Sequence, residues 1–512
     1  MSGTCAAELA DALRAVGLPI PPSPSLPASE PPGEEHAALD WARSGLMWLT
    51  GRPGHPPTVP DAPVLARARA AADLLGAASA ALGAPVAVDV PELLGGRAAL
   101  LGLRRGGAVS ANGSCRLLRA ADGWVAVNLP RPDDVDAVPA LLGAAPAEIL
   151  AAEHLDAGAG APEDDVWAAV TAALPSHGTR DLTERAWLLG LPLAPLPPAG
   201  AAGAAVAAPV RVFGACRAAP VPVGDRPRPL VVDLSSLWAG PLAAHLLGRM
   251  GMRVVKVEST HRPDGARLGN PDFYRWLHTG HESTRFDFTS AAGRAGLRQL
   301  VERADVVIEG SRPRALAQLG LDADRWVAAR AGRIWLSITG YGRHACAAGP
   351  GAGPVAFGDD AAVAGGLVAW DRTPPGGPVP VFCGDAIADP LTGLHAAMAV
   401  ALCRAGGIGA LVDVALRDVA GFVARPHQGP DPHPGTHPRP HPDSGHATSP
   451  TPWPAGEWSV AGSDEAGWTV HQAGQHSPVH PPRRPSDHAG RAPRPPRGPT
   501  PRLQGAQSPA GN

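Results

Sequence analysis

Short runs of consecutive hydrophobic residues alternate with amphipathic helical patterns over residues 229–425. The apolar runs include PLVVDLSS, RVVKVES, DVVIEG and RIWLSITGYG, and the helical patterns include GPLAAHLLGRMG and AAGRAGLRQLVERA. Continuous apolar strands separated by helices are typical of parallel βαβ units whose sheet is covered on both faces. We therefore predict an α/β domain with a Rossmann-like, doubly wound parallel sheet, whose ligands bind at the carboxyl ends of the strands.

The pattern over residues 106–198 predicts a smaller α+β domain. CRLLRAADGWVAVNLP predicts two strands joined by a turn at Asp122-Gly123. DDVWAAVTAALPSHGTRDLTERAWLLGLPLAPL predicts two helices followed by a strand. The remaining front segments are predicted to be an N-terminal helix with a Pro-rich linker over 1–33, a helical segment over 34–105 and an Ala/Gly/Pro-rich linker over 199–228.

Residues 426–512 are rich in proline and histidine and contain few aliphatic side chains. Such a segment buries too little apolar surface to offset the entropy of ordering, so we predict a disordered tail. Prolines interrupt the spacing of its histidines, which disfavours metal binding. The abrupt change of composition also suggests an off-frame reading of a GC-rich gene.

Composition and charge exclude several classes of protein. The net charge of −3 gives no electrostatic reason to expect binding to nucleic acid or an anionic membrane. No apolar run reaches about 18 residues, and the N-terminus lacks a basic region followed by an apolar one, so neither a membrane span nor a signal peptide is predicted. The six cysteines are scattered without a C-x-x-C pair, which indicates reduced thiols in a cytoplasmic protein without a disulfide or metal site.

Two distant segments of the chain follow the same pattern. Residues 44–90 and 365–414 both contain a turn of small residues, a Pro-rich connection, a long Ala-rich helix and a V-D-V strand. The separation is too long for a solenoid repeat and suggests two fused, related units. Ala68 in the first copy lies near the position that Asp389 has in the second.

The candidate chemistry lies near predicted strand ends, because no dinucleotide fingerprint, P-loop, nucleophile elbow or H-E-x-x-H motif occurs. Gly240 and Pro241 open a predicted helix whose free N–H groups favour an anion such as phosphate, although their spacing alone favours a well-packed βαβ turn. VFCGDAIADPLTGLHAAM contains two aspartates, Asp385 and Asp389. Asp389-Pro390 also fits the start of a helix, with the aspartate as N-cap.

An ordered series of segments over 229–420 resembles the class III CoA-transferase family (CaiB/BaiF type), which includes formyl-CoA transferase and alpha-methylacyl-CoA racemase. The series runs DLSSLWAGPLAAHLLGRMGMRVVKVES, FYRWLHTGHESTRFDF, ADVVIEGSRPRALAQLGL, IWLSITGYG, FGDDAAVAGGLVAW, VFCGDAIADPLTGLHAAMAVAL and VDVALRDV. Residues 106–198 resemble the small domain of the family, and 40–95 the segment just before it. The chain therefore looks like the back half of one member fused to the front half of another.

The resemblance implies a CoA-transferase that moves CoA from an acyl-CoA thioester to a carboxylic acid, with no permanently bound cofactor. Matching DPLTGLH to the family motif gives Asp389 the role of nucleophile. The family also implies an interlocked homodimer, which the fused halves here would imitate within one chain as a pseudo-dimer.

Two alternatives remain. A racemase of this family pairs a histidine with an aspartate at the position of Asp385, but Asp359 stands at the histidine position, which disfavours inversion of a carbon centre. Asp359 and Asp360 are then expected to be turn or cap residues. The chain is otherwise a catalytically impaired, CoA-binding relative or partner subunit.

The resemblance also implies a set of CoA contacts. It assigns adenine and phosphate contacts to Leu237, Trp238, Ala239, Ser259, Phe286, Gly310 and Ser311. Several transferases carry a basic residue at the position of Ser259, and Arg262 or Arg267 would supply that charge to a phosphate here. Trp238 either stacks on adenine or belongs to the core.

Overall fold

The computed structural model describes residues 2–21, 37–143, 162–198, 201, 206–217, 228–311, 313–347, 354–425 and 458–486. Within these residues the largest element is a seven-stranded sheet in the order β4-β12-β9-β8-β5-β6-β7. All neighbouring strands pair in parallel except β4, which pairs antiparallel with β12 at one edge. The predicted α/β class with a mainly parallel sheet is confirmed. The strands are β4 (Arg211–Arg217), β5 (Leu230–Asp233), β6 (Arg253–Ser259), β7 (Glu282–Phe286), β8 (Val306–Glu309), β9 (Ile334–Thr339) and β12 (Ile408–Ala415).

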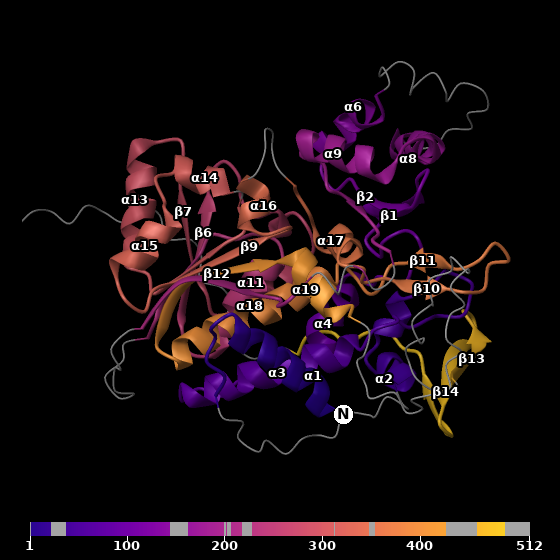
Figure 1. Cartoon of the computed structure of the whole chain (residues 1–512), viewed down its shortest axis with the longest axis horizontal. Helices are drawn as coiled ribbons and strands as arrows, with labels where there is room; N and C mark the ends of the chain where they lie inside the picture. Colours follow the sequence, from indigo (N-terminus) through magenta and orange to yellow (C-terminus); the bar gives the residue numbers. More distant parts are fainter. Residues whose placement is uncertain are drawn as a thin grey trace, which may run out of the picture.

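Helices cover both faces of this sheet because its strands alternate their apolar side chains between two cores. Val231 faces the core beneath α11 (Ala239–Arg249) and α18 (Ala388–Ala405), whereas Val232 faces the core beneath α13 (Ala291–Glu302) and α15 (Ala323–Ala329). On the α18 side a further layer follows, in which α3 (Val64–Ala81) packs on α18 and α1 (Ser2–Ala15) packs on α3 (Figure 1). The sequence-related helices α3 and α18 therefore lie against each other.

Helix α18 is almost entirely buried, which explains its Ala-rich composition. Small side chains allow α11 and α3 to approach it closely: a Cβ at Gly393 would come within 2.7 Å of the Ala239 carbonyl oxygen. Among the described residues, none of the helices has the combination of length and apolar character that crossing a membrane requires.

The front of the chain forms the predicted small sheet. Strands β1 (Cys115–Arg119), β2 (Trp124–Asn128) and β3 (Leu193–Pro195) are antiparallel, as the two-strand and helix–helix–strand patterns predicted. One face packs against α6 (Val138–Leu142), α8 (Pro162–Ala173) and α9 (Thr179–Leu189). The other face packs against α17 (Gly358–Ala364) and against Phe382, which follows β11 (Val379–Val381). The small sheet thus contacts the segment that precedes α18.

Remaining elements connect these layers. They are α2 (Ala37–Arg43), η2 (Leu46–Leu49), α4 (Val90–Leu101), α5 (Pro132–Asp136), η3 (Leu174–Ser176), η5 (Gly265–Arg267), α12 (Pro271–His278), α14 (Pro313–Gln318), α16 (Arg343–Ala347), β10 (Ala369–Asp371) and α19 (Leu416–Val423). The V-D-V strand expected at the end of the first repeat is wrong. Asp89 instead caps α4, accepting from the Glu92 N–H at 3.1 Å, with a proline in the first turn.

The predicted linker over 199–228 contains β4, so this prediction is wrong for Arg211–Arg217. Every residue of β4 is half-buried or exposed. Its sequence therefore does not need the continuous apolar run that is typical of the inner strands and that would have predicted it. As an edge strand, β4 is held in the sheet by its backbone hydrogen bonds to β12.

The predicted disordered tail is wrong for residues 458–486. Strands β13 (Trp458–Ser463), β14 (Gly467–Gln472) and β15 (Gln475–Pro478) form an antiparallel sheet beside α2 (Figure 1). Alternating residues of β14 enter the core, with Val470 fully buried, and this period-two pattern is too short to change the composition of the tail. The rest of the tail, and most of the Pro-rich linker predicted after α1, lie outside the described residues.

Candidate functional site

Four carboxylates gather where α17 begins and α18 begins. Asp359 and Asp360 belong to the first turn of α17, Asp385 lies in the turn before α18, and Asp389 lies in the first turn of α18. Asp360 and Asp385 are 0% exposed and Asp359 is 4% exposed. Asp389 is partly exposed, unlike the other three carboxylates.

Asp389 is held by a close contact with α17. The backbone N–H of Gly358 acts on its carboxylate and lowers the pKa of Asp389. A Cβ at Gly358 would overlap both Asp389 Oδ2 and the Ala386 carbonyl oxygen, so only glycine permits this approach. The structure therefore fixes one carboxylate oxygen against a backbone donor.

The N-cap prediction for Asp389 is wrong. Helix α18 begins at Ala388, its N-cap position is Ile387, and no side chain caps it. The T-G-L-H residues that follow in the DPLTGLH segment lie inside the same helix. The reason is the preceding turn, where Gly384 and Ala386 have positive φ angles of 78° and 40° and bring the chain into the helix one residue early.

Asp359 stabilises that turn. Its Oδ1 accepts from the backbone N–H of Ala386 at 2.9 Å, and its Oδ2 accepts from Asn112 Nδ2 at 3.0 Å. A non-glycine residue with positive φ costs of the order of 1–3 kcal/mol unless its surroundings impose the conformation. Asp359 is thus a turn residue, as predicted, and also a buried neighbour of the site.

Asp360 is a cap residue, as predicted. Its Oδ1 accepts from the N–H of Phe357, the N-cap of α17, at 3.0 Å. The same oxygen accepts from Asn128 Nδ2 of β2 at 2.8 Å. Asn112 and Asn128 therefore tie the small domain to the carboxylate group through one hydrogen bond each.

Arg97 of α4 brings a positive charge to these carboxylates. Its Nη1 lies 2.6 Å from Asp385 Oδ1, and its guanidinium carbon lies 5.4 Å and 5.7 Å from the ring centroids of Trp238 and Phe273. The sequence analysis missed Arg97 because its partner is 288 residues away in the chain. The signal in the sequence that could have indicated Arg97 is its position directly after Gly95-Gly96, a pair of glycines that the structure buries on α4.

The electrostatics of the group favour protonation. Burial raises the pKa of Asp389 to about 7, Arg97 opposes this shift, and Asp359 and Asp385 reinforce it. Burial likewise raises the pKa of Asp359 to about 6 and that of Asp360 to about 7, and it raises the pKa of Asp385 against the opposing charge of Arg97. Neighbouring carboxylates do not all ionise together, so the group holds protons near neutral pH.

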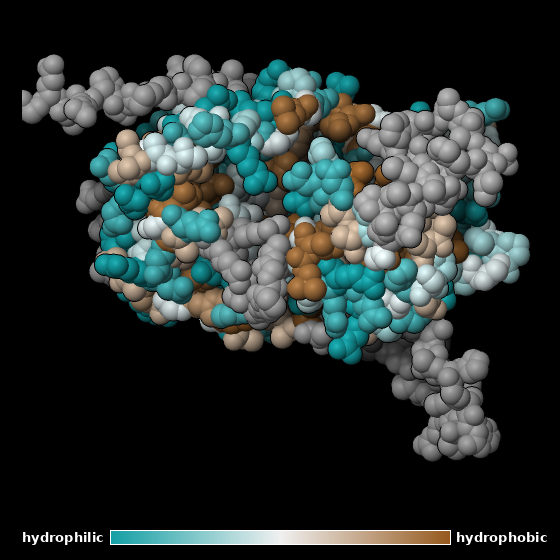
Figure 2. Space-filling model, turned by 90° about the horizontal axis from the view of Figure 1, so that it is seen from above, coloured by the Kyte–Doolittle hydropathy of each residue, from teal (hydrophilic) through white to brown (hydrophobic). Residues whose placement is uncertain are grey.

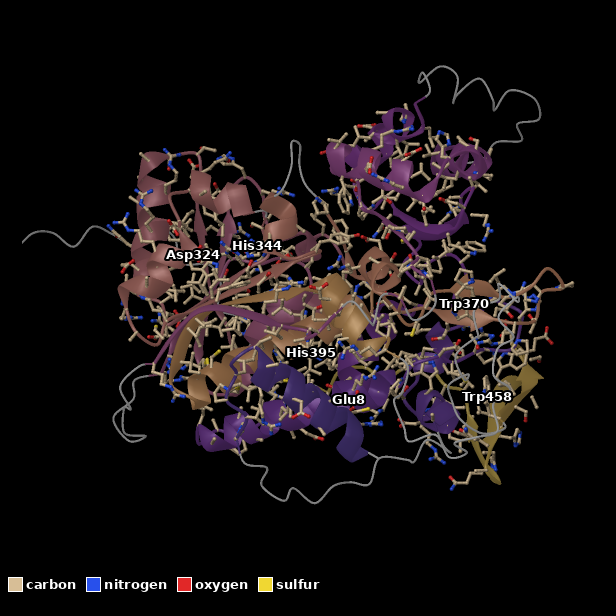
Figure 3. All side chains as sticks on the ribbon, in the orientation of Figure 1. Glu8, Asp324, His344, Trp370, His395 and Trp458 are labelled. Atoms are coloured by element: carbon tan, nitrogen blue, oxygen red, sulfur yellow. The ribbon has the colours of Figure 1, made fainter. Side chains whose placement is uncertain are left out.

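His395 is a core residue. It lies on α18 in the middle of the molecule (Figure 3), where Nδ1 is 2.7 Å from the Leu391 carbonyl oxygen of the same helix. Burial lowers the pKa of His395 to about 4, so the ring is neutral at physiological pH. The histidine of the T-G-L-H residues therefore adds no charge to the site.

The residues assigned to CoA by resemblance lie at the carboxyl ends of adjacent parallel strands. These are Leu237, Trp238 and Ala239 after β5, Ser259 at the end of β6, Phe286 at the end of β7, and Gly310 and Ser311 after β8. Leu237 has a φ of 71° and is 40% exposed, and its N–H donates to Asp264 Oδ1 at 3.0 Å. The sheet thus brings the whole set to one edge.

Trp238 belongs to the core at this edge. It is 3% exposed, and its ring contacts Phe273 edge-on with the centroids 5.5 Å apart, so the assignment to adenine stacking does not fit this structure. Arg267 pairs with Glu258, with Nη2 2.7 Å from Oε2, and is therefore engaged. Arg262 is exposed and is the better placed of the two arginines to meet a phosphate.

A buried ion network supports the same edge. Lys256, the only lysine of the chain, lies 3.0 Å from Asp264 Oδ2 and 3.5 Å from Asp233 Oδ2. All three side chains are almost fully buried. The network links the end of β5 and the middle of β6 to the loop that carries Arg262, and sequence reasoning did not identify it.

Fold and site together define an α/β protein with a candidate carboxylate nucleophile. Residues 229–452 match the model of CoA-transferase family III. The match covers somewhat less than half of the chain, and over these residues the chain is similar to that family.

Similar proteins include a succinate–glutarate CoA-transferase of Agrobacterium fabrum, 34% identical over 38% of this chain and 51% of the relative. A succinyl-CoA–D-citramalate CoA-transferase of Chloroflexus aurantiacus is 29% identical over 37% of this chain and 50% of the relative. A solved CaiB/BaiF family protein from Brucella suis is 32% identical, covers 38% of this chain and 54% of its own, and has a TM-score of 0.34. The chain spans about half the length of these relatives.

Proposed function

We propose that the protein transfers CoA from an acyl-CoA thioester to a carboxylic acid, with Asp389 as the nucleophile. The observation that carries the proposal is the position of Asp389, the partly exposed member of a buried carboxylate group, against the N–H of Gly358. The names of the relatives, which are CoA-transferases for dicarboxylic and hydroxy acids, support the same reaction and suggest succinyl-CoA as a donor.

In the first half of the proposed reaction, the Asp389 carboxylate attacks the thioester carbonyl carbon. The C–S bond breaks, giving an acyl–aspartyl anhydride and CoA thiolate. The thiolate then attacks the aspartyl carbonyl carbon of the anhydride, which releases the donor acid as its carboxylate and leaves an aspartyl–CoA thioester.

In the second half, the acceptor carboxylate attacks the aspartyl thioester carbonyl, forming a new anhydride and releasing the thiolate again. The thiolate attacks the acceptor acyl carbon, which forms the product thioester and restores the Asp389 carboxylate. No net proton transfer occurs. The buried surroundings of Asp389 would limit hydrolysis of both intermediates, and Gly358 N–H would stabilise charge at its carbonyl oxygen.

CoA would bind at the carboxyl edge of the sheet. Numbered from β5 to β12, the six parallel strands follow the order third, second, first, fourth, fifth, sixth, which supports the Rossmann-like, doubly wound description. We assign CoA contacts to Leu237, Ala239, Ser259, Phe286, Gly310 and Ser311, with Arg262 facing a phosphate. CoA is substrate here, and the reaction needs no permanently bound cofactor.

We infer that the two halves of the chain act as an intrachain pseudo-dimer. The contact between α3 of the first repeat and α18 of the second supports this arrangement, and α4 of the front half carries Arg97 to the site. A homodimer is the alternative assembly. The CoA thioester substrates would place the reaction in the cytoplasm.

The racemase alternative is less well supported. It would need two acid–base groups that face the substrate carbon from opposite sides. The two candidates are Asp359 and Asp385, which are 4% and 0% exposed and are engaged by Ala386 N–H and Arg97 respectively. Solvent exchange of the acyl-CoA α-proton would support a racemase, and its absence with active transfer would dismiss it.

Trapping with hydroxylamine tests the proposed function. The protein is incubated with succinyl-CoA or acetyl-CoA and hydroxylamine, and the peptide containing Asp389 is analysed by mass spectrometry. The aspartyl anhydride or thioester should yield a hydroxamate at Asp389, and Asp389→Asn should yield none. Failure of the wild type to give the adduct with a series of acyl-CoAs would favour the alternative of an impaired CoA-binding relative.

A further inference from the structure

We propose that Arg97 is a positioning residue that keeps Asp389 in its reactive carboxylate form, and that it is held in place for this role by its ion pair with Asp385. The inference rests on the proposed function of Asp389. It assigns a role in the site to the front half of the chain, which lies outside the part that matches the family.

The geometry fixes Arg97 firmly. One side of the guanidinium is bound by Asp385 at 2.6 Å, and the rings of Trp238 and Phe273 lie within 6 Å of its central carbon. Arg97 is 20% exposed, whereas Asp385 is fully buried. A cation packed between a carboxylate and aromatic faces in partly desolvated surroundings acts on nearby charges more strongly than a surface arginine does.

The helix that carries Arg97 is also fixed. A Cβ at Gly96 would come within 2.9 Å of Pro485 and 3.0 Å of Trp276, so α4 touches both neighbours here without intervening side chains. Asn270, the N-cap of α12, donates from Nδ2 to the Leu100 carbonyl oxygen of α4 at 3.2 Å. Arg97 therefore has a defined position relative to Phe273 of α12.

Three charged side chains, each from a different part of the chain, act on Asp389. Arg97 acts from α4, Asp359 from α17 and Asp385 from the preceding turn, and each influences the pKa of Asp389. Asp360 of α17 is engaged instead by Phe357 N–H and by Asn128 of the small domain, and His395 further along α18 is neutral. Of these groups, Arg97 is the cation, so it opposes both burial and the two negative neighbours.

A carboxylate nucleophile is reactive only when it has lost its proton. With a pKa of about 7, Asp389 is about half ionised at neutral pH. An opposite charge close by typically lowers a carboxyl pKa by about 1–3 units. Removal of Arg97 should therefore leave roughly a tenth of Asp389 ionised at pH 7, a loss of about fivefold or more in the rate of adduct formation.

The test measures the rate of hydroxamate formation at Asp389 as a function of pH, from about pH 5 to 9. Arg97→Met should move the acid limb of this profile up by about one unit or more. Arg97→Lys should restore most of the wild-type profile because it keeps the charge. Asp385→Asn should move the limb down, because it removes a negative neighbour of Asp389 and also removes the ion-pair partner of Arg97.

Shifts of the acid limb in opposite directions for Arg97→Met and Asp385→Asn would distinguish this role from a merely structural one, because a folding defect would lower the rate at every pH for both variants. Arg97→Met leaves Asp385 buried without its partner and risks misfolding, so Arg97→Met/Asp385→Asn provides a second variant without that unpaired charge. Its limb should lie between those of the single variants. Arg104→Met, a change at an exposed arginine just beyond α4, is the matched control and should leave the profile unchanged.

The two proposals fail in different ways. Wild-type protein that yields no adduct at Asp389 contradicts the proposed function. Wild-type protein that yields the adduct, with a folded Arg97→Met variant that retains the wild-type pH limb and a double variant whose limb coincides with that of Asp385→Asn, overturns the role of Arg97 and leaves the proposed function in place.

Discussion

Asp360 is a buried carboxyl whose protonation should affect stability. Its Oδ1 accepts two hydrogen bonds, while Oδ2 is buried and has no hydrogen-bond partner among the described residues. A proton on Oδ2 removes the charge and leaves both accepted bonds intact. This explains why burial raises the pKa of Asp360 to about 7.

The raised pKa makes a prediction for the free energy of unfolding. A group whose folded pKa exceeds its unfolded value of about 3.9 stabilises the fold below pH 4 and loses that contribution as pH rises through about 7. Asp360→Asn mimics the protonated form and should lose nothing over this range. The difference in unfolding free energy between wild type and variant, measured by urea titration, should therefore shift in favour of the variant between pH 4 and 8, by up to roughly 4 kcal/mol.

Because other buried groups titrate over the same interval, the wild-type curve alone is not diagnostic. Burial lowers the pKa of His281 to about 3, and such a histidine stabilises the fold at higher pH, in the opposite sense. Because these other groups titrate alike in wild type and Asp360→Asn, their contribution cancels in the difference between the two unfolding free energies. A difference that stays constant from pH 4 to 8 would show that Asp360 keeps its charge.

At the residue scale, local motifs were predictable and distant pairs were not. Asp389 could be identified because the residues that mark it are contiguous. Asp359 and Asp360 could be assigned as turn or cap residues because their segment lacks the histidine that a racemase needs. The N-cap assignment of Asp389 failed because the positive φ of Ala386 is imposed by Asp359, which lies 27 residues earlier in the chain. Arg97 could not be identified from its own segment, because its role depends on how α4 packs against the rest of the molecule.

At the scale of elements, the C-terminal segment following β15 braces α4. Pro482 lies against Gly95, Pro485 lies against Gly96, Arg483 Nη2 is 2.9 Å from Asp89 Oδ2, and Ser486 Oγ is 3.0 Å from a Glu92 carboxylate oxygen. These contacts follow one stripe of the helix. The segment also borders a pocket of about 470 Å³ between α4 and α11.

This contact predicts the effect of a single methyl group. In Gly95→Ala the new Cβ would lie 2.6 Å from Pro482 Cβ, so the segment or the helix must move. Overpacking of this kind costs about 1–3 kcal/mol, although alanine is the better helix former. Thermal unfolding should show a lower Tm. Gly376→Ala, where a Cβ meets nothing within 4 Å, is the control and should leave Tm nearly unchanged; equal Tm values for both variants would show that the contact is loose.

Periodic elements were predictable wherever their own residues carry the pattern. The inner strands β5, β8 and β9 are buried throughout, β6 is buried except at its two ends, and all four are predicted by their apolar runs. Strand β4 was missed because it is an edge strand with little buried surface. The first V-D-V segment predicts a strand because it copies the second, but its last residue, Val90, already begins α4.

At the scale of the whole molecule, segments far apart in the chain share one core. The largest core contains Leu9 of α1, Leu75 of α3, Leu394 of α18 and Val470 of β14. Figure 2 shows hydrophobic side chains also near the middle of the face seen from above, bordered by hydrophilic ones. Composition alone suggested a foreign tail, whereas the core includes residues from it, and this argues against an off-frame origin for residues 458–486.

If the tail sheet belongs to the fold, its polar contact with α2 should be essential. Gln472 is 3% exposed, and its Oε1 accepts from the backbone N–H groups of Ala38 and Leu39 at 3.0 Å and 3.4 Å. These N–H groups lie at the start of α2, where no carbonyl of the helix itself is available. Gln472→Ala would leave both buried and unsatisfied, at a cost of about 1–3 kcal/mol.

Urea unfolding of the full chain measures this cost. Gln475→Ala removes the same side chain from an exposed position three residues further on, where it contacts Arg43, and should change the unfolding free energy by less than about 0.5 kcal/mol. A cooperative transition shifted by Gln472→Ala and not by Gln475→Ala would show that the tail sheet unfolds with the core. If neither variant shifts the transition, the tail sheet is independent of α2, and the bracing of α4 by the same segment loses its structural basis.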